Sequence, residues 1–537
     1  MTLHPMIAAL GPEIVLAAGA CVVLLARGRR ADEPTDARPA PRSEFAPLAA
    51  VLTIAAALAV LILTEGPQHA PRSLRHDALT WYTRWIGLCV GVVIVMVNRH
   101  VPSGPERHEF FALLLFSLAG LLTAAAANDL IVLFLALELV SIPTYILVGL
   151  SRTDAAAQEA CGKYFFLGAF AAALMLYGFS FLYGAAGATT MFGDGGPAGG
   201  SVAGAVSLAM RGGRTDSLVT VGLLLAAAGL LFKIAAVPLH FYVPDVYQGA
   251  AAPVAGLLGF VPKFAGFVGL IRLLSLTGWQ TGAALFWTLW AIAVATMTAA
   301  NVMALMQNNV KRMLAYSSIA HSGTMVIGLL VGPGGGPANG SARNGVAALL
   351  FYIAVYGLMN LGAFAALAYF RRPDDSEGVE DLDQLSGAAE RHPAAALALA
   401  VCVLGLMGFP PTAGFLAKLY VFTSAYAAAD GSPHGAALVW LVVLGVINTA
   451  IAAAYYLRIV ATCYLGTATS PRVILRCGAL RAGLAVCAAS MLALFAFPGA
   501  VSRPAADAAL ASSSEVLRAD SQQRSAGASV DGIVAGG

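Results

Sequence analysis

Four charged side chains lie deep inside long apolar segments of this sequence: Glu138, Lys233, Lys263 and Lys418. If such a segment crosses a bilayer, a charge near its centre costs at least about 2.5 kcal/mol, so a residue of this kind is a candidate for function. Carboxylates and amines can both bind and release a proton. A glutamate and three lysines at membrane depth therefore indicate proton transfer.

The choice of lysine at these positions supports that interpretation. The 31 basic residues comprise 26 arginines and 5 lysines, and three of the five lysines lie in the apolar segments. Arginine does not release its proton in proteins, whereas a buried lysine can do so near neutral pH. The alternative is structural: a lysine near a helix end can extend to the membrane surface, and Glu138 can pair with it without any role in transport.

Prolines interrupt two of the lysine-bearing segments. Pro238 follows Lys233 by five residues, and Pro410 and Pro411 precede Lys418. Proline inside a spanning helix frees backbone groups that only protein or water can satisfy. A broken helix in each half of a chain is typical of inverted-repeat transporters, although a kink without transport is the alternative.

Histidine and cysteine give little support for a bound metal or cofactor in this chain. Only His240 and His321 are expected at membrane depth, as accessory polar groups or as hydrogen-bonded packing residues. A haem site would need paired ligands on facing helices. The seven cysteines are scattered and no C-x-x-C pair occurs, so an iron–sulfur cluster, a zinc site or a disulfide framework is not expected.

The elements that hold these residues are predicted to be transmembrane helices. Of the 537 residues, 59% are hydrophobic and 11% are charged, whereas a soluble protein has about 25% charged residues. Apolar runs of roughly 20 residues recur along the chain and are continuous rather than alternating, which favours helices over a barrel. The net charge is +3 and no basic block stands out, so nucleic-acid binding is not supported.

About fourteen runs are long enough to span a membrane, which predicts an all-α polytopic membrane protein. The predicted spans are residues 8–27, 45–64, 78–98, 110–127, 129–150, 160–184, 218–242, 253–274, 281–303, 313–332, 346–370, 394–427, 437–464 and 475–498. Lysine and arginine are more frequent in the loops after odd-numbered spans, which predicts that both termini are non-cytoplasmic. Gly-rich segments 187–217 and 332–345 are predicted to be flexible loops.

Several motifs between about residue 128 and residue 464 resemble one known family, and they occur in the right order. They are ELVSIPTYILVGL, FKIAAVPLHFYVPDVYQGAAAPVAGLLGFVPKFAGF, QNNVKRMLAYSSIAHSGTMVIG, GLMNLGAFAAL, GLMGFPPTAGFLAKLYVF and AAAYYLRIV. Together they are similar to the antiporter-like subunit N family of proton-pumping NADH–quinone oxidoreductase, which is respiratory complex I. The N-terminal three spans and the C-terminal tail resemble the family less.

The resemblance implies fourteen helices with two inverted five-helix repeats and breaks in helices 7 and 12. It divides the chain into three N-terminal helices (1–109), a first repeat of helices 4–8 (110–274), a second repeat of helices 9–13 (281–464), a final helix (465–502) and a polar, disordered tail (503–537). The family's proton-path residues match Glu138, Lys233, Lys263 and Lys418. Lys418 is discriminating, because the related subunit M has a glutamate at that position.

The implied function is that of a translocase subunit in the bacterial inner membrane. Protons would move along the glutamate and lysines, driven by electron transfer in other subunits, which would hold FMN, iron–sulfur clusters and quinone. The expected partners are the antiporter-like subunit M, the small subunits K and J, and the lipid bilayer. The alternatives are an Mrp-type or stand-alone cation/proton antiporter and a purely structural membrane-arm subunit.

Overall fold

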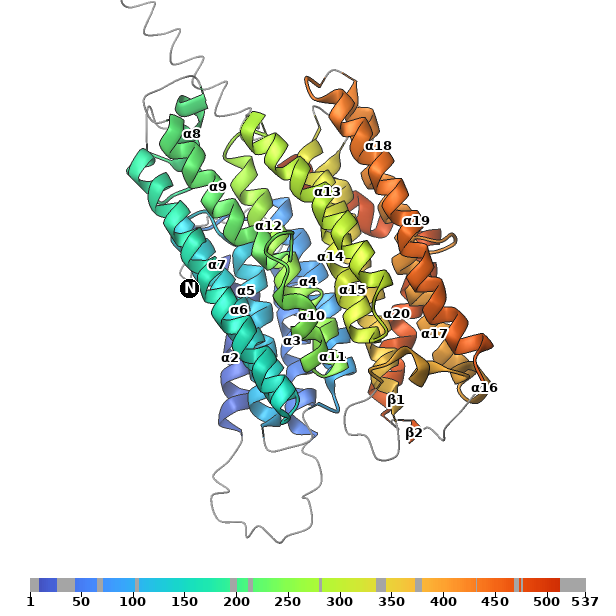
Figure 1. The fold of residues 1–537 in the computed structure, drawn as a ribbon. Coiled ribbons are helices and arrows are strands. Elements are labelled where there is room, and N and C mark those ends of the chain that lie inside the picture. Colours follow the sequence, from blue (N-terminus) through green and yellow to red (C-terminus); the bar gives the residue numbers. More distant parts are fainter. Residues whose placement is uncertain are drawn as a thin grey trace, which may run out of the picture.

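The structure, a computed structural model, is a bundle of long helices that run side by side (Figure 1). It describes residues 9–26, 44–64, 71–101, 106–193, 200–210, 216–279, 283–334, 344–371, 379–430, 432–467, 473–474 and 477–511. In this part of the chain, eleven helices are long and apolar enough to cross a membrane, and three further apolar helices are shorter. The prediction of an all-α membrane fold is confirmed.

Each predicted span coincides with one helix or with two consecutive helices. The first seven spans are α2 (Gly11–Leu25), α3 (Phe45–Leu63), α4 (Ala78–Asn98), α5 (Arg107–Ala126), α6 (Leu130–Ser151), α7 (Ala155–Ala186) and the pair α9 (Asp216–Lys233) and α10 (Tyr242–Gly249). The others are the pair α11 (Ala252–Leu258) and α12 (Val261–Ser275), then α13 (Ala283–Leu305), α14 (Val310–Val331), α15 (Gly345–Tyr369), the pair α17 (Pro393–Met407) and α18 (Ala413–Ala429), α19 (Gly435–Leu465) and α20 (Gly478–Ala496).

The connections hold more regular structure than the sequence predicted. A short helix, α8 (Val202–Met210), lies in the predicted loop 187–217 and buries Val202, Val206 and Ala209, which share one helical face. Between α15 and α17 lie η3 (Leu382–Leu385) and α16 (Ala388–Arg391), and β1 (Phe370–Arg371) pairs antiparallel with β2 (Val473–Ile474).

The polar tail, predicted to be disordered from residue 503, begins with a helical segment over residues 499–511. This segment is rich in alanine, the residue with the highest helix propensity. Its Ala505, Ala508 and Ala509 are fully buried, so packing adds to the local preference. The rest of the tail, residues 512–537, and residues 335–343 of the second predicted loop lie outside the described residues.

Both predicted helix breaks are present. Residues 234–241 separate α9 from α10 and include Pro238. Residues 408–412 separate α17 from α18 and include Pro410 and Pro411. In the predicted division into two five-helix repeats, each break falls in the fourth helix of its repeat.

A third interruption was not predicted. The span 253–274 was expected to be one helix, but it divides at Gly259 and Phe260 into α11 and α12, just before Lys263. Asn360 of α15 donates a hydrogen bond to the carbonyl of Gly256 at 3.2 Å, which gives this carbonyl a partner where the helix is interrupted. A Cβ atom on Gly259 would lie 2.1 Å from the amide nitrogen of Asn360, so glycine here leaves room for the Asn360 side chain.

Small residues set the distance between α7 and α9, the helix that ends at Lys233. A Cβ atom on Gly178 would lie 2.4 Å from the backbone nitrogen of Ala226, and one on Gly229 would lie 2.5 Å from Cβ of Met175. Membrane helices associate through close packing of small residues, because lipid is as apolar as their side chains. These glycines therefore hold the Lys233-bearing helix against its neighbour.

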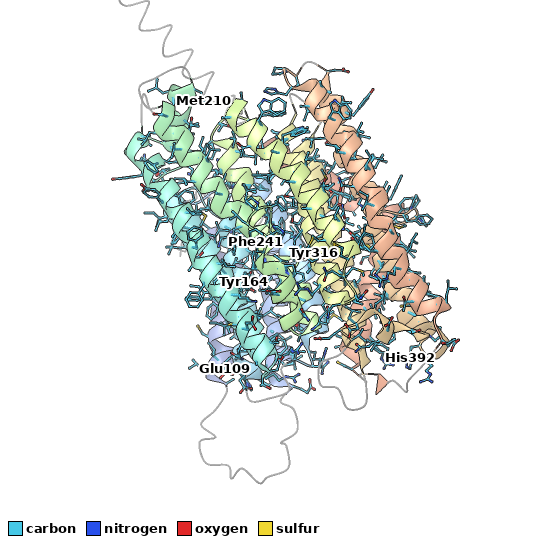
Figure 2. The ribbon with its side chains drawn as sticks, viewed as in Figure 1. Glu109, Tyr164, Met210, Phe241, Tyr316 and His392 are labelled. Carbon is cyan, nitrogen blue, oxygen red and sulfur yellow. The ribbon has the colours of Figure 1, made fainter. Side chains whose placement is uncertain are left out.

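The labelled residues in Figure 2 show which connections share an end of the bundle. Met210, at the end of α8, lies at one end, whereas Glu109 and His392 lie at the other. Tyr164, Phe241 and Tyr316 lie between them. Glu109 lies in the first turn of α5, just after the connection that follows the third span, and His392 lies in the connection that follows the eleventh span. Met210 ends α8, in the connection that follows the sixth span. The arrangement is that of a helical bundle whose chain crosses from one end to the other at each span.

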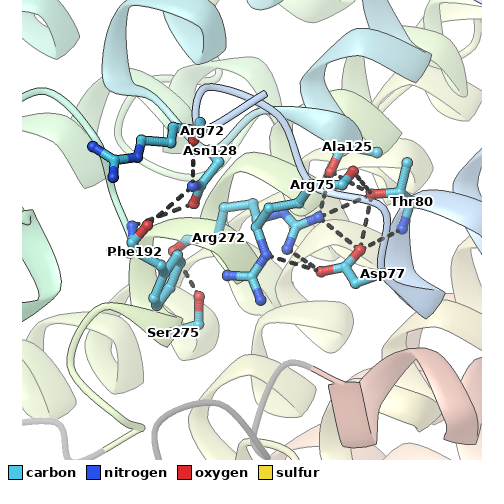
Figure 3. A network of polar contacts seen from close by, with 9 residues as sticks. All are labelled: Arg72, Arg75, Asp77, Thr80, Ala125, Asn128, Phe192, Arg272 and Ser275. Atoms are coloured by element: carbon cyan, nitrogen blue, oxygen red, sulfur yellow. Dashed lines mark hydrogen bonds and ion pairs between the residues drawn. The ribbon is translucent and has the colours of Figure 1, made fainter. Parts of the chain in front are cut away.

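An ion-pair network ties the N-terminal end of α4 to α12 (Figure 3). Arg272 of α12 is 2% exposed and forms two hydrogen bonds to the carboxylate of Asp77, the N-cap of α4. Asp77 also accepts from the backbone nitrogen of Thr80 at 2.9 Å. Burial raises the pKa of the Asp77 carboxyl, but Arg272 and Arg75 outweigh it and hold this pKa below its usual range.

We predict that Gly178→Ala destabilises the protein whereas Gly162→Ala does not. Alanine favours a helix over glycine by about 1 kcal/mol at either position of α7. At Gly178 the added methyl group meets backbone atoms of α9, whereas at Gly162 no atom lies within 4 Å. The thermal midpoint of the purified protein in detergent should fall for Gly178→Ala and stay level or rise for Gly162→Ala. Equal midpoints would contradict the packing argument.

We predict that Asp77→Asn costs about 3 kcal/mol, because it leaves Arg272 buried without its counter-ion. The control is Glu44→Gln, which removes a pair with Arg99 whose side chains are 57% and 45% exposed. An exposed pair is worth at most about 1 kcal/mol. Thermal unfolding in detergent measures both variants, and similar losses would show that the Asp77 network does not join the two helices.

Candidate functional site

The predicted glutamate and the first predicted lysine form an ion pair. The Nζ atom of Lys233, the last residue of α9, lies 3.0 Å from Oε1 of Glu138 on α6. It also donates a hydrogen bond to the hydroxyl of Ser141 at 2.7 Å, one helical turn further along α6. The partial negative charge at the C-terminal end of α9 adds to the carboxylate in stabilising the ammonium.

Lys263 lies in the first turn of α12, directly after the unpredicted interruption. It is 2% exposed, and its Nζ atom donates to the hydroxyl of Ser318 at 2.7 Å and to the carbonyl of the same residue. The Nζ atom lies 5.0 Å from the centre of the Tyr356 ring, a distance at which an ammonium is attracted to an aromatic face. These partners are all neutral, whereas Lys233 also contacts the carboxylate of Glu138.

A small cavity connects these two lysines. Lys233 and Lys263 both line it, together with Tyr164, Tyr242 and Tyr247. Its free volume is close to what one ordered water needs, and the ammonium and phenol groups are suitable partners for that water. The second lysine of the predicted path is therefore one water-sized gap from the first.

His321 of α14 lies beyond Lys263 and is 4% exposed. Its Nδ1 atom shares a hydrogen bond with the hydroxyl of Tyr352 at 2.7 Å, and its Nε2 atom shares one with the hydroxyl of Tyr456 at 3.0 Å. The His321 ring also packs against Tyr356, with ring centres 5.1 Å apart. The Tyr356 ring thus touches both Lys263 and His321 and bridges the two residues.

The hydrogen-bond acceptor of Lys418 lies at the second helix break. Its Nζ atom donates to the carbonyl of Met407 at 2.8 Å, and Met407 is the last residue of α17. The last carbonyls of a helix have no partner within it, so the break supplies an acceptor for the ammonium. Gly408 follows at φ +82°, and a Cβ atom there would lie 2.8 Å from Cδ of Lys418. Only glycine fits this backbone and leaves room for the lysine stem.

A second cavity lies beside Lys418, and His321 also lines it. Among its other lining residues are Asn301, Asn448 and Tyr456. It has room for an ordered water and several groups that can bind one. The structure therefore places these groups in one row through the molecule. In order, the row consists of Glu138, Lys233, a cavity, Lys263, Tyr356, His321, a second cavity and Lys418.

His240, predicted as an accessory polar residue, is separate from this row. It lies in the break between α9 and α10, is partly exposed, and stacks near the exposed ring of Phe241. It lines neither the cavity beside Lys233 nor the cavity beside Lys418. Pro238 of the same break is exposed as well, so residues 237–241 lie at the surface of the chain, whereas residues 234–236 are buried.

The neutral members of the row were not predicted from the sequence: they are Ser141, Tyr247, Ser318, Tyr352, Tyr356 and Tyr456. Hydroxyl groups are common in membrane helices, so their presence alone does not mark a site.

A further lysine, Lys311 of α14, was also missed. Its side chain is fully buried, and its Nζ atom lies 2.7 Å from Glu380 and donates to the carbonyl of Gln248 at 2.8 Å. Arg152 pairs with the same carboxylate at 2.8 Å. Burial raises the pKa of Glu380, but Lys311 and Arg152 outweigh it and lower this pKa below its usual value. Lys311 could have been noticed in the sequence, because it is one of five lysines in a chain with 26 arginines.

Comparison with known proteins gives the family. Residues 127–452, more than half of the chain, match the transmembrane domain family described as NADH:quinone oxidoreductase/Mrp antiporter. NADH-quinone oxidoreductase subunit N 2 of Roseiflexus castenholzii is 37% identical over 452 residues, which cover 83% of this chain and 86% of that protein.

Solved structures agree with this match. A chain of respiratory complex I from Thermus thermophilus with bound aureothin has a TM-score of 0.72 at 29% identity, covering 92% of this chain and 99% of that one. A chain of the Mrp complex from Dietzia has a TM-score of 0.75 at 18% identity, covering 97% and 100%, and so shares the fold. The chain therefore belongs to the subunit N family of NADH-quinone oxidoreductases.

Proposed function

We propose that this chain is a membrane-arm subunit of a proton-translocating NADH–quinone oxidoreductase, and that protons pass along Glu138, Lys233, Lys263 and Lys418. The observation that carries the proposal is the continuity of the row. Lys233 and Lys263 line one cavity, and His321 and Lys418 line another. Electron transfer, with its FMN, iron–sulfur clusters and quinone, takes place in other subunits and drives the translocation.

The first step is a change in the Glu138–Lys233 distance. At 3.0 Å the carboxylate holds the proton on the lysine. One charge about 5–6 Å from another, at an effective dielectric near 20, is worth about 3 kcal/mol. A free energy of this size moves the pH at which Lys233 releases its proton by about two units. Separation of the pair therefore releases the proton into the cavity, where Lys263 can receive it.

The later steps pass through neutral groups. Lys263 contacts Ser318 and the Tyr356 ring, and Tyr356 packs against His321. The imidazole can accept a proton on one nitrogen and release one from the other, and its two nitrogens face different tyrosine hydroxyls. Water in the second cavity then connects His321 to Lys418, from which the proton leaves.

A neighbouring subunit covers the face of α6 that carries Glu138. The Glu138 side chain remains 18% exposed, and Leu135 and Ile142 beside it are 60% and 49% exposed. A carboxylate next to lipid at this depth is costly, so protein contact on this face is favourable. The proposed partners are the small subunits K and J and the antiporter-like subunit M, in a bacterial inner membrane with both termini non-cytoplasmic. The proposed repeats are residues 110–274 and 281–464.

The second candidate is an Mrp-type cation/proton antiporter that uses the same lysines without a redox partner. The fold shared with the Dietzia Mrp complex favours it. Purification of the chain from its native membrane separates the two candidates. Quinone-reductase subunits in the purified complex support the first, and antiporter subunits without them support the second.

We predict that Lys263→Arg abolishes proton pumping in the assembled complex, because arginine keeps the charge but does not release a proton. The control is Lys163→Arg, since Lys163 is 43% exposed and needs only its charge to pair with Glu159 and Asp245. Proton uptake per NADH oxidised in sealed vesicles measures both variants. Unchanged pumping by Lys263→Arg would rule out a proton-carrying role for this residue.

We predict that Glu138→Gln lowers pumping and moves the alkaline limit of the pumping that remains to lower pH by about two units, since Lys233 loses the carboxylate that favours its charged form. Glu159→Gln is the control, because Glu159 is 66% exposed and pairs with Lys163 at the surface. The measurement is the pH profile of pumping. An identical profile for Glu138→Gln and the unmodified complex would show that the pair does not set proton release.

A further inference from the structure

A pair of buried asparagines joins the two helices beside Lys418. Asn301 of α13 and Asn448 of α19 are 3% and 4% exposed. The amide nitrogen of Asn301 donates to the side-chain oxygen of Asn448 at 3.1 Å and to its backbone oxygen at 3.2 Å. Neither residue ionises, so neither stands out among the charged residues of the sequence.

Both asparagines line the cavity that holds Lys418 and His321. An ammonium group has three N–H donors, and the structure gives Lys418 the Met407 carbonyl as its protein acceptor among the described residues. The remaining donors are available to the cavity. A water there can accept from Lys418 and donate to carboxamide oxygens, so it has the several polar partners that a buried water needs.

The carboxamides are held in place from both sides. Tyr455 donates its hydroxyl to the side-chain oxygen of Asn301 at 3.1 Å. The amide nitrogen of Asn448 donates to Thr298 at 3.2 Å and to the Leu444 carbonyl at 3.0 Å. A fixed dipole beside a titrating group acts without reorganising, which is more effective than a mobile one.

We propose that Asn301 and Asn448 form a hydration site that positions the water through which Lys418 exchanges its proton with His321. The inference rests on the proposed function, in which Lys418 carries the translocated proton. The two asparagines are positioning residues. Because they do not titrate, they can hold the water in one place in both protonation states of Lys418.

The same contacts could instead serve only to pack α13 against α19, since side-chain amides hydrogen-bond across membrane helices. The pH dependence of pumping can distinguish these roles, and it depends on the ionisable groups that face the cavity. They are Lys418 from α18, His321 from α14, and Tyr455 and Tyr456 from α19. Beyond them lie Tyr352, bonded to His321, and Lys263 on the far side of Tyr356. No carboxylate of the described residues lines the cavity, so adding one is a sensitive probe.

The test uses the assembled complex in sealed vesicles with Asn448→Leu, Asn448→Asp and the control Asn98→Leu. Asn98 is also a fully buried asparagine that hydrogen-bonds between helices, but it lies on α4, outside the cavity. Asn448→Leu should lower pumping per NADH about tenfold while the complex still assembles. Asn448→Asp should move the alkaline limit of pumping up by about one pH unit, because a carboxylate favours charged Lys418. Asn98→Leu should leave both the pumping per NADH and its alkaline limit unchanged.

The outcomes separate the possibilities. Unchanged pumping in Asn448→Leu, or an unshifted pH profile in an assembled Asn448→Asp complex, overturns the proposal. Failure of both Asn448 variants to assemble, with normal Asn98→Leu, identifies a packing contact and overturns it as well. A parallel Lys418→Arg complex tests the underlying function: if it pumps normally, the role of Lys418 fails, and if it is inactive while Asn448→Leu pumps normally, only the hydration site fails.

Discussion

An ammonium group inside a membrane needs oxygen acceptors, and this requirement shapes the centre of the molecule. Lys233 has the carboxylate of Glu138, Lys263 has Ser318, and Lys418 has the carbonyl of Met407. Each acceptor is of a different kind, and only the first is charged. The three lysines are therefore held with different strength, as the proposed sequential proton transfer requires.

The broken helices follow from the same requirement. At the second break, the chain stops forming helical hydrogen bonds after Met407, and the freed carbonyl is used by Lys418. Lys233 itself is the last residue of α9, where the helix dipole favours its positive charge. Prolines keep the two halves of each broken helix from rejoining, and glycines such as Gly408 leave room for the lysine stem. The interruptions thus have an electrostatic purpose as well as a geometric one.

The outer parts of the bundle hold this centre in position. Arg272 of α12 is bound to Asp77, which fixes the far end of the helix that begins near Lys263. Lys311 and Arg152 share Glu380, and Lys311 also binds the carbonyl of Gln248 near the end of α10. Both networks are charged and lie near the ends of helices, and each buried cation in them has a carboxylate partner. The membrane interior is left to a few charges and many neutral hydroxyl and amide groups.

The sequence by itself determined the all-helical membrane fold, the two proline breaks and the charged residues of the candidate path. It could do so because an apolar run of about 20 residues and a charge within it are each readable from one segment. Only the tertiary structure decided that His321 lies in the row and His240 outside it, that the helix at Gly259 is interrupted, and that Asn301 meets Asn448. The physical reason is that a neutral side chain costs little in a membrane helix, so its role depends on which residues of distant segments pack against it.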